Sequence, residues 1–112
     1  MSDCVLNLRN EPRLRHIFEH DHIHDGTVLI DRRTEWGNPF RIGQDGDRDT
    51  VIALYRSDLW HRIRTGHIGL EEFAELDGMW LACWCDPLPC HGHVLARAAR
   101  WAAERLENSH FA

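Results

Sequence analysis

Apolar and polar residues form blocks along the chain, and the spacing within each block predicts its secondary structure. Three short apolar runs, two of them rich in β-branched residues or leucine, predict strands at residues 4–8, 27–31 and 79–84. Apolar residues at helical spacing predict one long helix after residue 49, a short one near 70–76 and a last one from about 90 to 107. Strands separated by helices predict an α/β fold with a short, mainly parallel sheet and helices packed against it.

The predicted helices have one apolar face each. The long middle helix is expected to be capped by Asp49 or Thr50 and to be ended by Gly66. Its expected buried residues are Val51, Leu54, Tyr55, Leu59 and Ile63. The last helix is expected to bury Val94, Leu95, Ala98, Trp101, Ala102 and Leu106.

Two segments between the predicted elements are polar. Residues 13–25 are charged and rich in histidine, which predicts a loop or an added hairpin. In an extended chain His20, His22 and His24 fall on one side, but surface polar decoration is favoured there over a second metal site. Residues 32–46 contain many turn-forming residues and predict a long loop, and such loops in compact domains are often functional.

Length and composition indicate one small globular domain over residues 1–112. The chain is 43% hydrophobic and 28% charged, and its sequence contains no run near the roughly 20 apolar residues that span a bilayer. The first residues lack the basic start and apolar centre of a signal peptide. We therefore expect a cytoplasmic protein whose cysteines are reduced.

All 13 basic residues are arginine, and the net charge is −5 with neutral histidines. This charge argues against a broad nucleic-acid-binding surface, although a local group of arginines can still hold one anion or a short strand. The planar guanidinium suits phosphate and carboxylate groups.

Cysteine and histidine gather where the third predicted strand leads into the last helix. Cys83, Cys85 and Cys90 fall within eight residues, and His91 and His93 follow. Cys83 and Cys85 share one face of a strand, with Trp84 on the other face, so Cys90 and His91 can complete a Cys₃His zinc site. His93 is a substitute for His91 in that set.

The same segment has three other interpretations. Cys90 at the start of a helix is placed for a stabilised thiolate, and with His91 or His93 as the base it can act as a nucleophile. The backbone N–H groups there can instead hold a phosphate. Alternatively, Cys83 and Cys85 fill the core as small apolar groups. Cys90 and His91 fit that alternative least, since helix starts are seldom deep in a core.

The loop after the second strand offers groups for ligand recognition. Arg32, Arg33 and Arg48 suit anion contacts, Trp36 offers a stacking face, and Asn38 has paired donor and acceptor groups. In a parallel sheet this loop and the cysteine segment open on the same edge. The structural alternative is that Trp36 and Phe40 close the end of the sheet.

Two motifs also carry a family resemblance: Trp36-Gly37-Asn38-Pro39-Phe40, and Cys83-Trp84-Cys85 with Cys90-His91-Gly92-His93-Val94-Leu95. Together they resemble an uncharacterised bacterial and phage family described as a domain of unknown function. The resemblance covers about residues 27–103 and implies no activity. The family usually has aspartate in place of His93, and residues 13–25 are an insertion relative to typical members.

These observations lead to two hypotheses. In the first, residues 36–40 and 83–93 enclose a pocket for a nucleotide-like or other small anionic ligand. Cys90 and His91 would supply hydrolase or group-transfer chemistry, with Arg32, Arg33, Trp36, Asn38, Arg48 and His93 binding the ligand. A dinucleotide cofactor is not expected, because no Gly-x-Gly-x-x-Gly motif is present. In the second, the chain is a non-catalytic zinc module that binds protein or nucleic acid.

Overall fold

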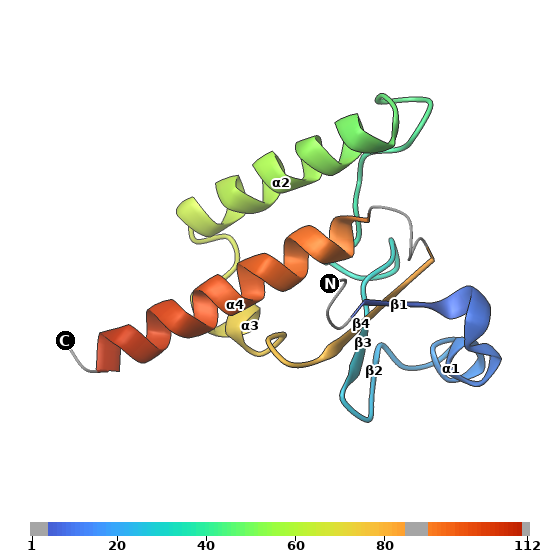
Figure 1. Cartoon of the computed structure of the whole chain (residues 1–112), viewed down its shortest axis with the longest axis horizontal. Coiled ribbons are helices and arrows are strands. Elements are labelled where there is room, and N and C mark those ends of the chain that lie inside the picture. Colours follow the sequence, from blue (N-terminus) through green and yellow to red (C-terminus); the bar gives the residue numbers. More distant parts are fainter. Residues whose placement is uncertain (1–4, 85–89, 111–112) are drawn as a thin grey trace.

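The computed structural model describes residues 5–84 and 90–110, and within them a four-stranded sheet forms the centre of the fold (Figure 1). The strands are β1 (Val5–Asn7), β2 (Ile23–His24), β3 (Thr27–Leu29) and β4 (Trp80–Cys83), and their order across the sheet is β1-β4-β3-β2. β1, β4 and β3 are parallel, and β2 runs antiparallel to β3. The expected α/β fold with a short, mainly parallel sheet is confirmed.

The helical elements follow the apolar periodicity. They are the 3-10 turn η1 (Leu8–Asn10) and the helices α1 (Pro12–Ile17), α2 (Arg48–Arg64), α3 (Leu70–Ala74) and α4 (His91–His110). The cap of α2 is Asp47, so the expectation of Asp49 or Thr50 is wrong. The carboxylate of Asp47 accepts a hydrogen bond of 2.9 Å from the N–H of Thr50, which satisfies a donor that the first helical turn leaves unpaired.

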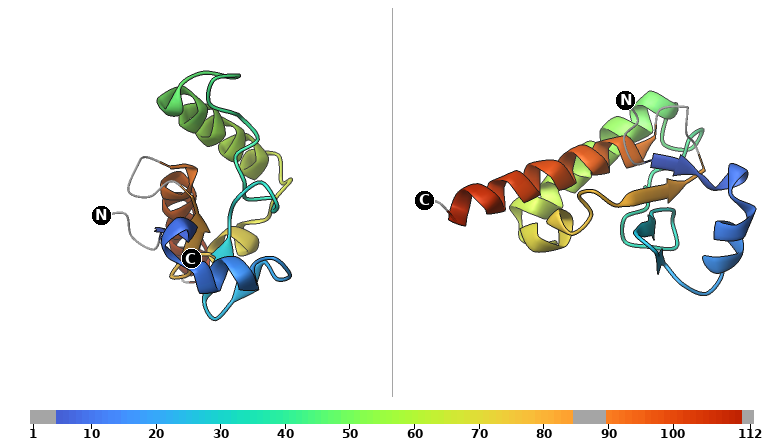
Figure 2. Two further views of the ribbon diagram at one scale, coloured as in Figure 1. Left: turned by 90° about the vertical axis from the view of Figure 1, so that its right-hand side faces the viewer. Right: turned by 60° about the horizontal axis from the view of Figure 1, so that its bottom comes forward.

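Side chains of the central strands alternate between two separate apolar clusters. Leu81 and Cys83 of β4 belong to the larger cluster, which also contains side chains of α2, α3 and α4. Ala82 lies in the smaller cluster, against which Trp84 also packs. Figures 1 and 2 show α2 and α4 together on one side of the sheet and α1 apart from them. The expectation that Trp84 faces away from Cys83 is confirmed; Cys85 lies outside the described residues.

Residues 13–25 were expected to form a loop or a hairpin, and the structure confirms only the hairpin. The first part of this segment is helical and packs against the smaller cluster. Leu14 and Phe18, four residues apart, place an apolar edge of α1 against the sheet, and Phe18 is fully buried. The rest of the segment forms the β2–β3 hairpin. Its turn residues Asp25 and Gly26 both have positive φ, of 49° and 77°, as a tight two-residue hairpin requires.

The two long helices bury a narrower face than their periodicity predicts. In α2 the fully buried residues are Val51, Tyr55 and Leu59. In α4 they include Leu95, Ala98, Ala99 and Ala102, whereas Trp101 is 36% exposed and the expectation that it is buried is wrong. Trp101 instead packs edge-on against Trp60 of α2, with ring centroids 4.9 Å apart. Within the described ranges, none of the helices has the length and apolar character needed to cross a membrane.

The topology brings two distant segments to one edge of the sheet. Because β3 and β4 are parallel neighbours, the loop after β3 and the chain after β4 leave the sheet on the same side, where α/β proteins usually bind ligands. Gly37 lets the loop fold closely on itself: a Cβ there would clash with the carbonyl oxygen of Asp31 and lie 2.7 Å from the Cα of Arg32. The predicted convergence of these segments is confirmed.

Candidate functional site

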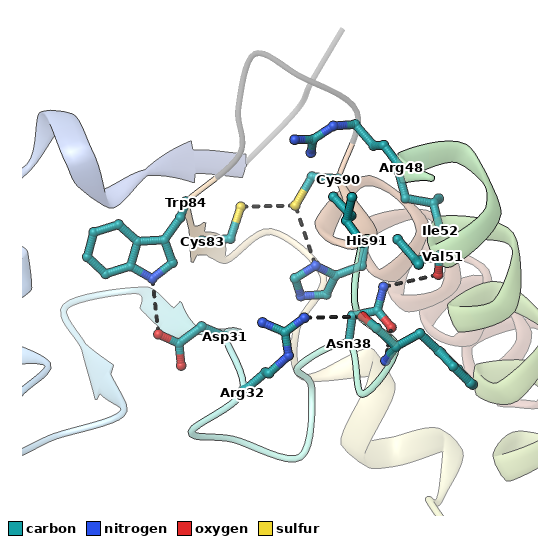
Figure 3. Close-up of a pocket in the computed structure, with 12 residues that line it drawn as sticks. Asp31, Arg32, Asn38, Arg48, Val51, Ile52, Cys83, Trp84, Cys90 and His91 are labelled. Carbon is teal, nitrogen blue, oxygen red and sulfur yellow. Dashed lines mark hydrogen bonds between the residues drawn. The ribbon is translucent and has the colours of Figure 1, made fainter. Parts of the chain in front are cut away.

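A pocket of about 150 Å³ opens between the loop after β3, the start of α2 and the start of α4 (Figure 3). We call it the thiol pocket. Its polar lining comes from Asp31, Arg32, Asn38, Arg48, Cys83, Cys90 and His91, and its apolar lining from Phe40, Ile42, Val51, Ile52 and Trp84. The pocket therefore lies between the loop after β3 and the cysteine–histidine segment, the two segments predicted to be functional, and the first turns of α2 complete it.

The ring of His91 is held in one orientation by a backbone oxygen and an aromatic side chain. Its Nε2 lies 2.6 Å from the carbonyl oxygen of Ile30. A carbonyl oxygen can only accept, so Nε2 carries the proton in this contact. The ring of Tyr55 packs edge-on against the imidazole, with centroids 5.0 Å apart. His91 is thus fixed as a donor at Nε2, and its second nitrogen, Nδ1, faces the sulfur of Cys90.

Tyr55 is itself anchored. Its hydroxyl donates a hydrogen bond of 2.8 Å to the carbonyl oxygen of Trp36. Burial raises the pKa of Tyr55 well above its usual value, so the phenol remains a donor at any physiological pH. Tyr55 therefore ties α2, the loop after β3 and the ring of His91 into one rigid unit.

The sulfur of Cys90 faces both a base and a backbone donor. Nδ1 of His91 lies 3.5 Å from Sγ of Cys90, and the N–H of Gly92 donates to the same sulfur at 3.4 Å. Cys90 directly precedes α4, where the helix dipole favours negative charge. A thiolate at Cys90 would therefore be stabilised by the first turn of α4, and His91 is placed to take its proton.

Cys83, at the end of β4, completes the sulfur-containing wall. Its Sγ lies 3.0 Å from Sγ of Cys90, and the two side chains are 1% and 3% exposed. His91 is 9% exposed, so the expectation that the helix start lies away from the core is wrong. The reason is Gly92, which lets α4 begin directly against the sheet: a Cβ there would lie 2.9 Å from Cδ1 of Ile30.

The predicted zinc ligands are in contact only in pairs. Cys83 lies beside Cys90 and Cys90 lies beside Nδ1 of His91, while Cys85 lies outside the described residues. Tetrahedral zinc with Zn–S bonds of about 2.3 Å holds two sulfurs roughly 3.8 Å apart. The observed 3.0 Å is shorter, so the two sulfurs would have to separate to bind zinc. In the part of the chain that the structure describes, no three or more His, Cys, Asp or Glu side chains are grouped to hold a metal ion, His20, His22 and His24 included.

Two of the three predicted anion-binding arginines line the pocket. Arg32 donates from Nη2 to the carbonyl oxygen of Phe40 at 3.1 Å, which holds its guanidinium at the pocket wall. Arg48 enters from the first turn of α2. Arg33 lies elsewhere: it forms an ion pair of 2.6 Å with Asp31 and donates to the carbonyl oxygen of Phe18.

Asp31 is the acidic residue of the pocket lining, and its charge is compensated. Burial raises the pKa of Asp31, but hydrogen bonds from Arg33 and Trp84 and the positive charge of Arg33 outweigh burial and hold this pKa below its usual value. The carboxylate is therefore ionised at neutral pH and paired with Arg33.

The remaining predicted ligand residues have mainly structural contacts. Asn38 lines the pocket, but its amide donates to the carbonyl oxygen of Val51 and accepts from the N–H of Phe40. Trp36 is 8% exposed and packs edge-on against Phe73, outside the pocket lining. His93 accepts a hydrogen bond from the N–H of Cys90 at 3.2 Å, at the start of α4. These positions favour the structural alternative for Trp36.

The sequence did not predict three contributors to the site. Two of them, Phe40 and Trp84, are among the residues that line the pocket, although the structural alternative placed Phe40 at the end of the sheet and Trp84 was expected to face away from Cys83. The indole of Trp84 turns away from Cys83 toward Asp31, although Trp84 at the end of β4 is among the residues that line the pocket (Figure 3). The carbonyl of Ile30 was also missed, because a backbone acceptor leaves no trace in a residue pattern.

Comparison with known proteins identifies the family of the chain. Over 73 residues it is 42% identical to a protein of Enterobacteria phage T4 described as an uncharacterised 12.4 kDa protein in the nrdA-td intergenic region. The aligned part is 64% of this chain and 66% of the phage protein, slightly less than two thirds of that relative. No solved structure matches the chain. Residues 15–101 match the model of a domain of unknown function, DUF4326, so the chain belongs to the DUF4326 family.

Proposed function

We propose that the thiol pocket binds a small anionic, nucleotide-like molecule and acts on it through a nucleophilic cysteine. The observation that carries this proposal is the orientation of His91, whose Nε2 is committed to the backbone of Ile30 while Nδ1 faces Cys90. Cysteine nucleophiles are activated by such an adjacent base, itself oriented by a third group.

The proposed reaction is a hydrolysis or group transfer through a covalent intermediate. Nδ1 of His91 accepts the thiol proton, and Sγ of Cys90 forms a bond to the electrophilic atom of the substrate. The bond to the leaving group then breaks, and His91 returns the proton to that group. Water or an acceptor molecule attacks the covalent adduct and releases Cys90. Buried surroundings strengthen each of these electrostatic interactions.

The charge and shape of the pocket support an anionic substrate. Arg32 and Arg48 offer planar, multidentate donors of the kind that bind phosphate and carboxylate. Phe40, which also lines the pocket, offers an aromatic side chain against which a planar group can pack. A ligand with an anionic group and a flat apolar part, such as a nucleotide, matches both features.

Space beside the pocket supports a ligand larger than its own volume. At about 150 Å³ the thiol pocket is smaller than ligand sites of roughly 300–1,000 Å³. Arg32 also borders a more open groove of about 480 Å³, whose lining includes Arg41 and Arg62 as well as Glu35 and Asp58. The reactive group of a substrate can thus lie beside Cys90 while the rest extends past Arg32 into this groove.

The chemistry requires free thiols, so we expect the protein to act in a reducing compartment such as the cytoplasm. The zinc-stabilised module remains the alternative. It predicts that Cys83→Ser, Cys85→Ser and Cys90→Ser each unfold the domain, because structural zinc supplies folding energy. The proposed enzyme instead keeps its fold in Cys90→Ser. Elemental analysis of untagged protein separates the two: about one zinc per chain supports the module.

Binding is tested by isothermal titration with inorganic phosphate, adenosine monophosphate and uridine monophosphate. At least one of them should bind, and Arg48→Ala and Arg32→Ala should each weaken binding by about tenfold, the loss of one charge-assisted contact. Arg56→Ala is the matched control, because Arg56 is exposed on α2 and lines neither the pocket nor the groove. Absence of binding to all three, or equal weakening by Arg56→Ala, would contradict the anionic ligand.

A further inference from the structure

We infer that Cys83 and Cys90 form a redox-active pair, which a small hydroperoxide entering the thiol pocket oxidises to a reversible disulfide. This inference goes beyond the proposed function, because it assigns a second reaction and a second class of substrate to the pocket. It depends on the geometry of the two cysteines and holds whichever ligand the arginines bind.

The two sulfurs are already close to bonding distance. They lie 3.0 Å apart, and a disulfide bond measures about 2.04 Å, so closure requires an approach of only about 1 Å. Cys83 ends β4 and Cys90 directly precedes α4, so the bond would join the sheet to the helix across seven positions of the sequence. Both residues belong to the larger apolar cluster, which holds their side chains in this arrangement.

Cys90 is the member of the pair that is equipped to react first. Its sulfur accepts from the N–H of Gly92 and faces Nδ1 of His91, and both contacts favour the thiolate that attacks peroxides. Cys83 lies on the strand, so it lacks the favourable dipole of a helix N-terminus. The assignment is therefore asymmetric, with Cys90 as the attacking sulfur and Cys83 as the resolving sulfur.

The pocket supplies the route for the oxidant. Cys83 and Cys90 are almost completely buried, yet both line the thiol pocket. Its volume of about 150 Å³ admits hydrogen peroxide or a small alkyl hydroperoxide, whereas a protein disulfide cannot reach sulfurs at this depth. The pair should thus respond to small peroxides and resist exchange with large oxidised proteins.

The reaction balances in two steps. The thiolate of Cys90 attacks the outer oxygen of the hydroperoxide, the O–O bond breaks, and the alkoxide takes a proton and leaves as an alcohol. Cys90 is then a sulfenic acid. The thiol of Cys83 attacks the Cys90 sulfur, the S–O bond breaks, and hydroxide leaves with the thiol proton as water. Two thiols lose two electrons, the peroxide gains them, and a small dithiol reverses the oxidation.

The test is peptide mapping of the full-length reduced protein before and after brief treatment with a small excess of hydrogen peroxide. We expect a mass decrease equal to two hydrogen atoms, a disulfide-linked peptide that joins Cys83 to Cys90, and full recovery with dithiothreitol. In Cys83→Ala the resolving sulfur is absent, so Cys90 should stop at the sulfenic acid and react with dimedone. In Cys90→Ala the peroxide should leave Cys83 unmodified under the same conditions.

The wild-type map alone decides the inference, even where a variant folds poorly. A disulfide that joins Cys90 to Cys85, or peroxide treatment that leaves both thiols reduced, would overturn it. Phosphate and nucleotide titration of the reduced protein measures the proposed function separately, so either idea can fail without the other. Circular dichroism of each variant confirms that its fold is intact before oxidation.

Discussion

The indole of Trp84 donates a hydrogen bond of 3.2 Å from Nε1 to Oδ2 of Asp31, which links the ends of β4 and β3 beside the thiol pocket. The same carboxylate receives the guanidinium of Arg33 and the backbone N–H of Arg33. One acidic side chain therefore fixes the relative positions of the two strand ends from which the functional segments leave the sheet. Its loss should affect both stability and the shape of the pocket.

Asp31→Asn should lower the free energy of unfolding by about 1–2 kcal/mol at pH 7, the cost of weakening charge-assisted hydrogen bonds near the surface. The pKa of Asp31 is lower in the folded chain than in the unfolded chain. Its contribution is therefore present above the unfolded value of about 3.9 and is lost as pH falls through the folded pKa. Urea denaturation of wild type and variant from pH 7 to pH 3 measures the free energy of unfolding of each. The difference between these two free energies should become smaller below about pH 4.

The control for this series is Asp77→Asn, because Asp77 is exposed at the turn before β4. It should change stability by less than about 0.5 kcal/mol, as is usual for a surface position. A stability difference for Asp31→Asn that stays constant over the whole pH range would contradict the role given to its charge.

Gly92→Ala should destabilise the fold by about 1–3 kcal/mol, the usual cost of an added methyl group in a packed site. The new Cβ would lie 2.9 Å from Cδ1 of Ile30 and 3.4 Å from Val5, so the side chain of Ile30 or the start of α4 would have to shift. A shift of α4 would also move Cys90 and His91. Chemical denaturation measures the loss of stability.

Gly69→Ala provides a comparison for Gly92→Ala at another helix start. Gly69 precedes α3, and a Cβ there would meet its nearest atom, a glutamate side-chain oxygen, at 3.5 Å. Its cost should stay below about 1 kcal/mol, from the weaker capping by alanine. Equal losses in the two variants would show that the close approach of α4 to the sheet is unimportant.

Asn38→Ala should cost about 1–3 kcal/mol, because it leaves the buried carbonyl of Val51 and the N–H of Phe40 without their side-chain partner. These bonds hold the loop after β3 against α2, so the substitution should also loosen the Phe40 wall of the pocket. Thermal denaturation gives the stability, and the binding of inorganic phosphate reports on the pocket. A variant as stable as wild type would contradict this role of Asn38.

The fold could be predicted largely because its elements have strong local patterns. Val28 and Leu81 stand in apolar runs typical of buried parallel strands, and Val51, Tyr55 and Leu59 repeat at helical spacing. Helix α1 was missed because Leu14 and Phe18 are its main apolar anchors among charged residues. The Asp25-Gly26 pair was a usable hairpin signal, since both residues tolerate positive φ.

The candidate site could be predicted in its location but not in its contacts. Because the ends of parallel strands meet at one edge of a sheet, the sequence alone predicted that Arg32 lies near Cys90. Which arginine faces the pocket depends on tertiary partners: Arg33 is held by Asp31 and Phe18, whereas Arg32 is held by Phe40. Cys90 is buried because Gly92 lets α4 begin close against the sheet, and the periodicity of apolar residues does not predict such a close approach.

The central claim is that Cys90 is a nucleophile beside anion-binding arginines. The most direct test measures the rates at which iodoacetate and iodoacetamide alkylate Cys90 at pH 7, by peptide mass spectrometry. The rate with iodoacetate divided by the rate with iodoacetamide should be about tenfold or more higher for Cys90 than for N-acetylcysteine, because Arg32 and Arg48 attract the anionic iodoacetate. Arg48→Ala should remove this preference, and His91→Gln should slow both reagents by about 10–100-fold. A ratio in wild type equal to that of N-acetylcysteine, with rates unaffected by His91→Gln, would contradict the account.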